Sequence, residues 1–121
     1  MNTFQDLVAS WMQKCFGPEI SADTKERNHR FFEEAAELVQ ANGMTRSEAH
    51  QLVDYVFNRP VGELHQESGG VSVTHAALCD AAGLCMDSCA AIELNRINNP
   101  RTLEKIRKKH AAKPKHSPLP E

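Results

Sequence analysis

The fold is decided by the stretch Arg30-Phe31-Phe32-Glu33-Glu34-Ala35-Ala36-Glu37-Leu38-Val39, which sets three carboxylates inside an otherwise apolar helical run. At about 3.6 residues per turn, Glu33 and Glu37 lie one turn apart, and Glu34 lies between their row and the apolar face. Like charges one turn apart repel, and a carboxylate beside a core is costly unless something neutralises it. Clustered carboxylate oxygens suit a hard divalent cation, so this helix is predicted to bind Mg²⁺ or Mn²⁺.

The remainder of the chain also reads as helix, because no segment alternates β-branched and polar residues over a useful length. A capping box at Thr45-Arg46-Ser47-Glu48 and an Asn99-Pro100 start mark two helix beginnings. Four of the predicted helices cover about 2–15, 63–82, 86–98 and 100–112. Two more run from a cap within 21–23 to 41, and from the capping box at 45–48 up to 60. We therefore expect an all-α helical bundle of about five to six helices, with one domain over 1–112 and a flexible tail over 113–121.

Composition narrows the class of protein. With 121 residues and 40% hydrophobic content, the chain can bury a modest core, which we expect oligomerisation to complete. A net charge of −2 gives no reason to expect nucleic acid or an anionic membrane as partner. The chain shows no membrane-spanning run and no signal-peptide pattern at its start, and its four cysteines form no CxxC pair, so we expect a cytoplasmic protein with reduced thiols.

A second set of acids opens the predicted helix 63–82. Glu63 and Glu67 lie one turn apart, on a stripe that Thr74 and apolar residues continue toward the core. Gly69-Gly70, beside them, predicts close approach by another backbone or a ligand, or else a local kink. Two helices that each contribute inward acids can build a metal cage in a bundle, although ordinary solvated acids are the alternative.

These residues resemble the all-α nucleoside triphosphate pyrophosphohydrolases, a superfamily that includes MazG, dimeric dUTPases and phosphoribosyl-ATP pyrophosphohydrolases. Glu33-Glu34-Ala35-Ala36-Glu37 matches the EExxE motif, and Glu67 stands where the second motif, ExxD, begins. The sequences of residues 27–34 and 69–74 are similar to those of a phage and prophage branch of small MazG-like proteins. The resemblance covers about residues 1–110. One departure is Gly70, which stands where the second motif carries Asp.

The resemblance implies metal-dependent hydrolysis of a deoxynucleoside triphosphate to its monophosphate and pyrophosphate, in a homodimer or homotetramer. Glu33, Glu34 and Glu37 are the expected catalytic residues. Metal binding by Mg²⁺ or Mn²⁺ is expected at Glu34, Glu37, Glu63 and Glu67, and Glu33 or Glu63 would be either a further ligand or the general base. A bound water loses its proton more readily beside a metal, and a glutamate can accept that proton.

Six further residues are predicted to bind the nucleotide: Trp11, Lys25, Asn28, Thr74, Arg96 and Lys105. Trp11 would stack on the base, with core packing as its alternative, and Thr74 would donate a hydrogen bond across the site. Arg96 and Lys105 would hold phosphates, with a solvated helix face as the simpler explanation.

Three functions remain open from the sequence. The first is the pyrophosphohydrolase, with purine deoxynucleotides (dGTP or dATP) favoured through the resemblance to phage proteins. A non-catalytic helical adaptor is the second, in which Gly70 marks a lost catalytic site and the acids bind a basic partner. The third is hydrolysis of a phosphoribosyl nucleotide.

Overall fold

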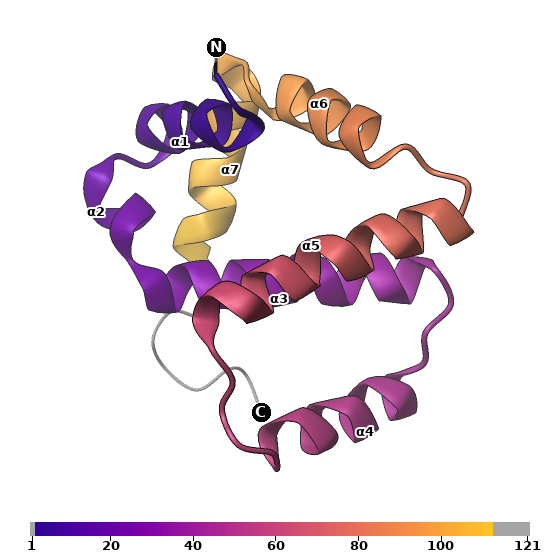
Figure 1. Ribbon diagram of the computed structural model, residues 1–121. Coiled ribbons are helices and arrows are strands. Elements are labelled where there is room, and N and C mark those ends of the chain that lie inside the picture. Colours follow the sequence, from indigo (N-terminus) through magenta and orange to yellow (C-terminus); the bar gives the residue numbers. More distant parts are fainter. Residues whose placement is uncertain (1, 113–121) are drawn as a thin grey trace. The chain divides into compact units, whose positions relative to one another are not determined.

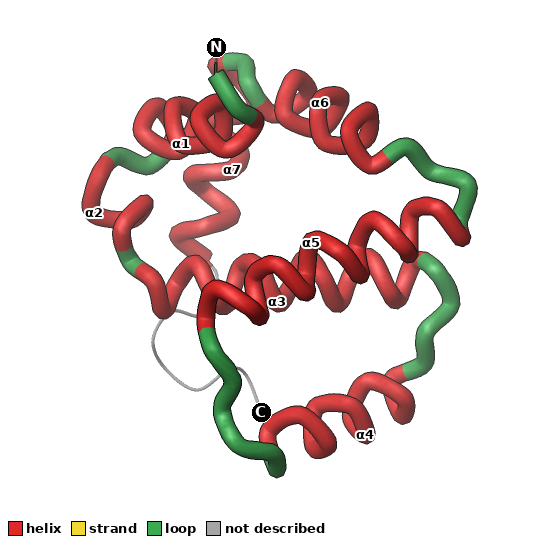
Figure 2. Tube along the Cα trace, viewed as in Figure 1, coloured by secondary structure: helices red, strands yellow, loops and turns green. Residues whose placement is uncertain are grey.

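The computed structural model describes residues 2–112, and across that range every regular element is an α-helix. Figure 1 shows the order of the helices along the chain, and Figure 2 shows the short loops that join them. The prediction of an all-α protein is therefore confirmed. The helices are α1 (Phe4–Cys15), α2 (Pro18–Ala22), α3 (Thr24–Ala41), α4 (Arg46–Phe57), α5 (Leu64–Ala81), α6 (Met86–Ile97) and α7 (Pro100–Ala112).

Residues 2–112 hold seven helices, whereas the sequence predicted about five to six. The additional element is α2, which lies between the first two predicted helices and carries Pro18 at its first turn. Proline is pre-organised for that position, so a single helical turn forms where a loop was expected. The predicted tail, 113–121, lies outside the described residues.

Local signals in the sequence set most helix ends. Thr3 and Thr45 each form a capping box, with Asp6 and Glu48 as the acidic partners. Hydrogen bonds from these threonines hold the pKa of both acids below the ordinary range. Asn99 accepts from the backbone N–H of Thr102 at 3.0 Å, as the Asn99-Pro100 pattern predicts.

The described residues fall into two compact units, and the prediction of a single domain over 1–112 stays a prediction. The first unit contains the described residues 2–32 and 90–112, and there α1 packs against α2 and α7. Its core is Trp11, Cys15 and Leu103, against which lie the partly buried Met12, Phe16, Leu94, Ile97 and Ile106.

Polar contacts reinforce this core. The indole Nε1 of Trp11 donates to the carbonyl oxygen of Ile97 at 3.0 Å. The guanidinium of Arg107 donates to the carbonyls of Cys15 and Lys14, at 2.7 and 2.9 Å. Carbonyls at a helix C-terminus lack partners within the helix, so Arg107 satisfies the end of α1 while joining it to α7.

A buried carboxylate also belongs to the first unit. Glu26 on α3 is only 2% exposed, and its Oε1 lies 3.2 Å from Nε of Arg30 and 3.5 Å from Nδ1 of His110 on α7. Its oxygens form ion pairs without a well-aligned hydrogen bond among the described atoms. Because a buried charge needs a close counter-charge, Arg30 makes this site tolerable.

The second unit, residues 33–89, has a different character. Every residue from 50 to 77 is exposed, and Cys79 is the buried residue that the structure describes in this unit. Large apolar side chains lie open on α4, α5 and their flanking turns, namely Leu52, Val53, Tyr55, Val56, Phe57, Val61, Leu64, Val71, Val73 and Leu84. No helix within 2–112 is both long enough and apolar enough to cross a bilayer.

Candidate functional site

The acids of the EExxE stretch lie on the half of α3 that belongs to the second unit. Glu34 and Glu37 are exposed, and Glu33 is half-buried. Within the range that the structure describes, the side chains of Glu34 and Glu37 form neither a hydrogen bond nor an ion pair. Unpaired carboxylate oxygens are the donors that a hard cation prefers, so these two residues fit the expected metal.

The second set of acids lies at the start of α5, in the same unit. Glu63 is the N-cap, with extended backbone angles, and its Oε2 accepts from the backbone N–H of Gln66 at 2.7 Å. A cap of this kind satisfies one of the orphan donors at a helix start. One oxygen of Glu63 is therefore already occupied in ordering the helix, which leaves Glu67 as the freer carboxylate.

Glu67 folds back over the turn before its helix. Its Oε1 would lie 2.8 Å from a Cβ atom placed on Gly62, a distance shorter than real Cβ contacts. The missing side chain at Gly62 therefore makes the room in which the carboxylate of Glu67 rests. Glu67 makes no hydrogen bond or ion pair through its side chain with residues 2–112, so it resembles Glu34 and Glu37 in being available.

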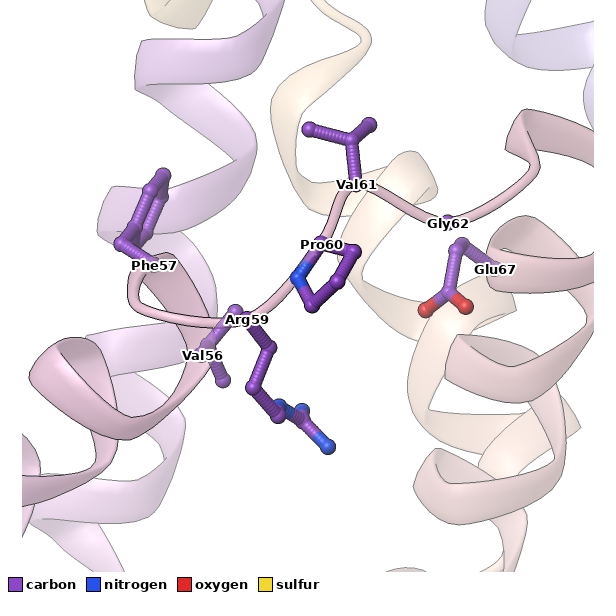
Figure 3. Close-up of a pocket in the computed structure, with 7 residues that line it drawn as sticks. All are labelled: Val56, Phe57, Arg59, Pro60, Val61, Gly62 and Glu67. Atoms are coloured by element: carbon purple, nitrogen blue, oxygen red, sulfur yellow. The ribbon is translucent and has the colours of Figure 1, made fainter.

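Figure 3 shows a pocket at the turn between α4 and α5, in which the carboxylate of Glu67 lies beside Gly62. The cavity has a volume of about 520 Å³ and is lined by Val56, Phe57, Arg59, Pro60, Val61, Gly62 and Glu67. Its walls are mostly apolar, and its two charged groups are Arg59 and Glu67. All seven residues belong to the second unit.

Arg59 was missed by the sequence reasoning, which took its phosphate-binding candidates from elsewhere in the chain. Its guanidinium carbon lies 4.2 Å from the ring centroid of Tyr55, and Nη1 lies 3.5 Å from the tyrosine oxygen. The sequence feature that could have indicated Arg59 is a basic residue in the turn directly before Glu63 and Glu67.

Among residues 2–112, no group of three or more His, Cys, Asp or Glu side chains is arranged to hold a metal ion. The chain thus supplies two sets of carboxylates in one unit, on α3 and at the start of α5. Metal ligation by Glu34, Glu37, Glu63 and Glu67 stays a prediction, and so does the catalytic role of Glu33, Glu34 and Glu37.

Two of the predicted nucleotide-binding residues already contact other groups of the protein. Trp11 is buried in the first unit, where its ring meets Phe16 edge-on at 6.0 Å, as its core-packing alternative describes. The hydroxyl of Thr74 donates to the carbonyl of Gly70 on its own helix, at 2.9 Å. Base stacking by Trp11 and a hydrogen bond from Thr74 across the site stay predictions.

The other predicted nucleotide-binding residues lie in the first unit. Arg96 forms a two-point ion pair with Glu93, at 2.8 and 2.7 Å, which lowers the pKa of that glutamate. Lys25, Asn28 and Lys105 are exposed. Whether these residues join the acids of the second unit in one site stays a prediction.

Gly69 and Gly70 lie inside α5, and open space surrounds the position of a Cβ atom at each. The close approach that this glycine pair predicted is not made within the described chain. The pair presents bare helix backbone one turn after Glu67.

No protein-family model matches this chain, and neither a curated protein nor a solved structure is significantly similar to it.

Proposed function

We propose that this protein is a metal-dependent nucleoside triphosphate pyrophosphohydrolase that releases pyrophosphate from a deoxynucleoside triphosphate. The observation that carries the proposal is the availability of three carboxylates, those of Glu34, Glu37 and Glu67, on two helices of the same unit. Unpaired carboxylates that come close together repel each other, and a divalent cation relieves that repulsion. The resemblance to the all-α pyrophosphohydrolases supports the same chemistry.

In this proposal the glutamates have distinct tasks. Glu34, Glu37 and Glu67 would hold Mg²⁺ or Mn²⁺, which would neutralise the triphosphate and make water more acidic. Glu33 or Glu63 would accept the proton of the attacking water. The Oε2 of Glu63 already accepts a backbone N–H, so its other carboxylate oxygen is the one left to accept a proton.

We further propose that a second copy of the chain covers the apolar side chains of α4 and α5. The exposed residues Leu52, Val53 and Val56 share one stripe of α4, at helical spacing. Large contiguous apolar surfaces are rare on soluble monomers and mark association. A symmetric dimer or tetramer would bury this stripe and supply the core that the second unit lacks.

A second candidate function is a non-catalytic helical adaptor. It is favoured by Gly70, which stands where the resembling family carries the Asp of its second motif. A lost ligand would leave fewer metals bound and little hydrolysis. The acids would then recognise a basic partner.

The decisive experiment incubates the purified protein with each deoxynucleoside triphosphate, and with a phosphoribosyl nucleotide, in Mg²⁺ or Mn²⁺, and measures released pyrophosphate. We expect release with at least one nucleotide, with dGTP and dATP the first to test. Glu37→Gln and Glu67→Gln should each lower turnover by about 100-fold or more, because each removes a charged metal ligand.

The matched control is Asp54→Asn, which removes an exposed carboxylate of α4 in the same unit. Its turnover should equal that of the unchanged protein, and circular dichroism should show equal helix content in all three variants. Absence of pyrophosphate with every nucleotide at high protein concentration would reject the enzyme and leave the adaptor.

A further inference from the structure

The pocket between α4 and α5 brings opposite charges to one apolar cavity. Arg59 and Glu67 line the same space, together with side chains of Val56, Phe57, Pro60 and Val61 (Figure 3). Its volume of about 520 Å³ falls within the roughly 300–1,000 Å³ that small-molecule sites occupy. A cavity with apolar walls and few charged groups is the usual form of a ligand pocket.

The guanidinium of Arg59 is held without a carboxylate partner. Over the range 2–112, no Asp or Glu forms an ion pair with it, and its described contacts are with Tyr55. The ring beneath the guanidinium restricts its movement through a cation–π interaction. A guanidinium that is ordered yet lacks a counter-charge is prepared to bind an anion, and its planar donors match two phosphate oxygens.

The carboxylate of Glu67 adds a second requirement. By itself it would repel a phosphate, so an anion enters this cavity more favourably with a cation that neutralises Glu67 than without one. A phosphate chain that carries a divalent cation meets both conditions, since its metal faces the carboxylate and its oxygens face the guanidinium.

We propose that Arg59 is a phosphate-binding residue of the pocket that Glu67 shares, and that the ligand is a metal-bound polyphosphate. This inference rests on the proposed function and identifies a substrate-binding residue for it.

The test measures binding of inorganic tripolyphosphate by isothermal titration calorimetry, once with Mg²⁺ and once with a chelator. Arg59→Ala should weaken binding about tenfold in both conditions, because a charge-assisted contact is lost whether or not metal is present. Glu67→Gln should weaken tripolyphosphate binding only when Mg²⁺ is present. In the chelator, the Glu67→Gln protein should bind tripolyphosphate at least as tightly as the unchanged protein.

The matched control is Arg46→Ala, which removes an exposed arginine at the other end of α4. Arg59→Lys, which keeps the charge and loses the planar fork, should fall between the alanine variant and the unchanged protein. Equal tripolyphosphate affinity in the Arg59→Ala and Arg46→Ala proteins overturns the proposal, and so does a failure of the unchanged protein to bind tripolyphosphate.

A parallel assay separates this inference from the proposed function. If a nucleotide is hydrolysed and Arg59→Ala leaves KM unchanged, Arg59 does not bind phosphate, and the proposed enzyme activity is upheld. If no nucleotide is hydrolysed but Arg59→Ala still weakens tripolyphosphate binding, the enzyme is rejected and the phosphate site stands. Circular dichroism of Arg59→Ala and Arg59→Lys establishes that both variants fold.

Discussion

The two units of the chain differ in how their helices are stabilised. In the first unit, α1 and α7 bury Trp11, Cys15 and Leu103. A hydrogen bond of Arg107 joins α7 to α1, and one of Trp11 joins α1 to the end of α6. In the second unit, every residue from 50 to 77 is exposed, although most of α4 and most of α5 lie within that range. Equal helical regularity therefore arises from tertiary packing in one region and from local signals in the other.

This difference bears on where function lies. A short helix without tertiary packing is marginal in water, even with good caps, and this is the physical ground for the second copy proposed above. The available carboxylates Glu34, Glu37 and Glu67 and the unpaired Arg59 all belong to the second unit. The groups on which the proposed metal, ligand and second copy depend therefore all belong to the second unit.

The largest effect on stability is expected in the first unit. Trp11→Ala should lower the free energy of unfolding by about 3–5 kcal/mol, because it empties the centre of the core and removes the hydrogen bond to Ile97. Urea denaturation followed by circular dichroism measures the change. Trp11→Phe should cost less, because it keeps an aromatic ring; a loss below about 1 kcal/mol for alanine would contradict the described core.

Association should depend on the second unit. The double variant Leu52→Glu/Val56→Glu should weaken self-association by about 100-fold or more, because carboxylates cannot be buried unpaired in an apolar interface. Light scattering coupled to size exclusion measures the mass. His50→Glu/Gln51→Glu adds the same charge to α4 off that stripe and should associate normally. Equal masses for the two double variants would remove α4 from the interface.

Thiol reactivity distinguishes the units by a smaller factor. Burial raises the pKa of Cys15 in the first unit, with Arg107 opposing in part, whereas hydrogen bonds from Ser88 lower the pKa of the exposed Cys85 in the second. Because the thiolate is the reactive form, Cys85 should be alkylated by iodoacetamide about tenfold faster than Cys15. Its alkylation should also begin at a lower pH than that of Cys15. Mass spectrometry of peptides reads both rates, and Ser88→Ala should shift the Cys85 profile to higher pH.

The smallest effect compares two equivalent caps. Thr3→Ala and Thr45→Ala each remove a capping box, at a cost of about 1 kcal/mol. Hydrogen exchange should show fraying limited to the first turn of α1, which α7 supports, but spread along α4, whose residues 50–57 are all exposed. Identical spread in the two helices would show that α4 is held as firmly as α1.

The pH dependence of these caps follows from their acids. The pKa values of Asp6 and Glu48 are lowered by hydrogen bonds from Thr3 and Thr45. Each cap thus contributes stability above the unfolded pKa of its acid and loses it as pH falls through the lower folded value. The difference between each threonine and its alanine variant should therefore narrow in acid.

Much of the fold could be predicted from local chemistry. The capping box at Thr45, the Asn99-Pro100 start and the helix ends near Gly43 and Gly83 were all predicted from short patterns, and both glycines have the positive φ that a helix end favours. Such features depend on a few adjacent residues. The α2 turn was missed because a proline after a glycine marks either a loop or a helix start.

The candidate site likewise contains residues that the sequence identified and residues that it did not. The sequence identified the acids of α3 and α5 from their spacing, and it identified Glu63 as a ligand or base without its capping role. It missed Arg59 because nothing in a turn residue's type indicates that it will rest on Tyr55 with no counter-charge. It likewise did not predict that Glu26 would be the fully buried carboxylate, which depends on Arg30 and His110.

What the sequence determined by itself is the helical class, most helix ends and the two sets of acids, because hydrogen bonding within a helix and side-chain periodicity act over a few residues. What only the tertiary structure decided is which side chains are buried. Trp11 entered a core, Glu26 entered an ion-pair cluster, and the apolar stripe of α4 remained exposed. Burial depends on contacts between segments distant in the chain, and no local pattern records which distant segments will meet.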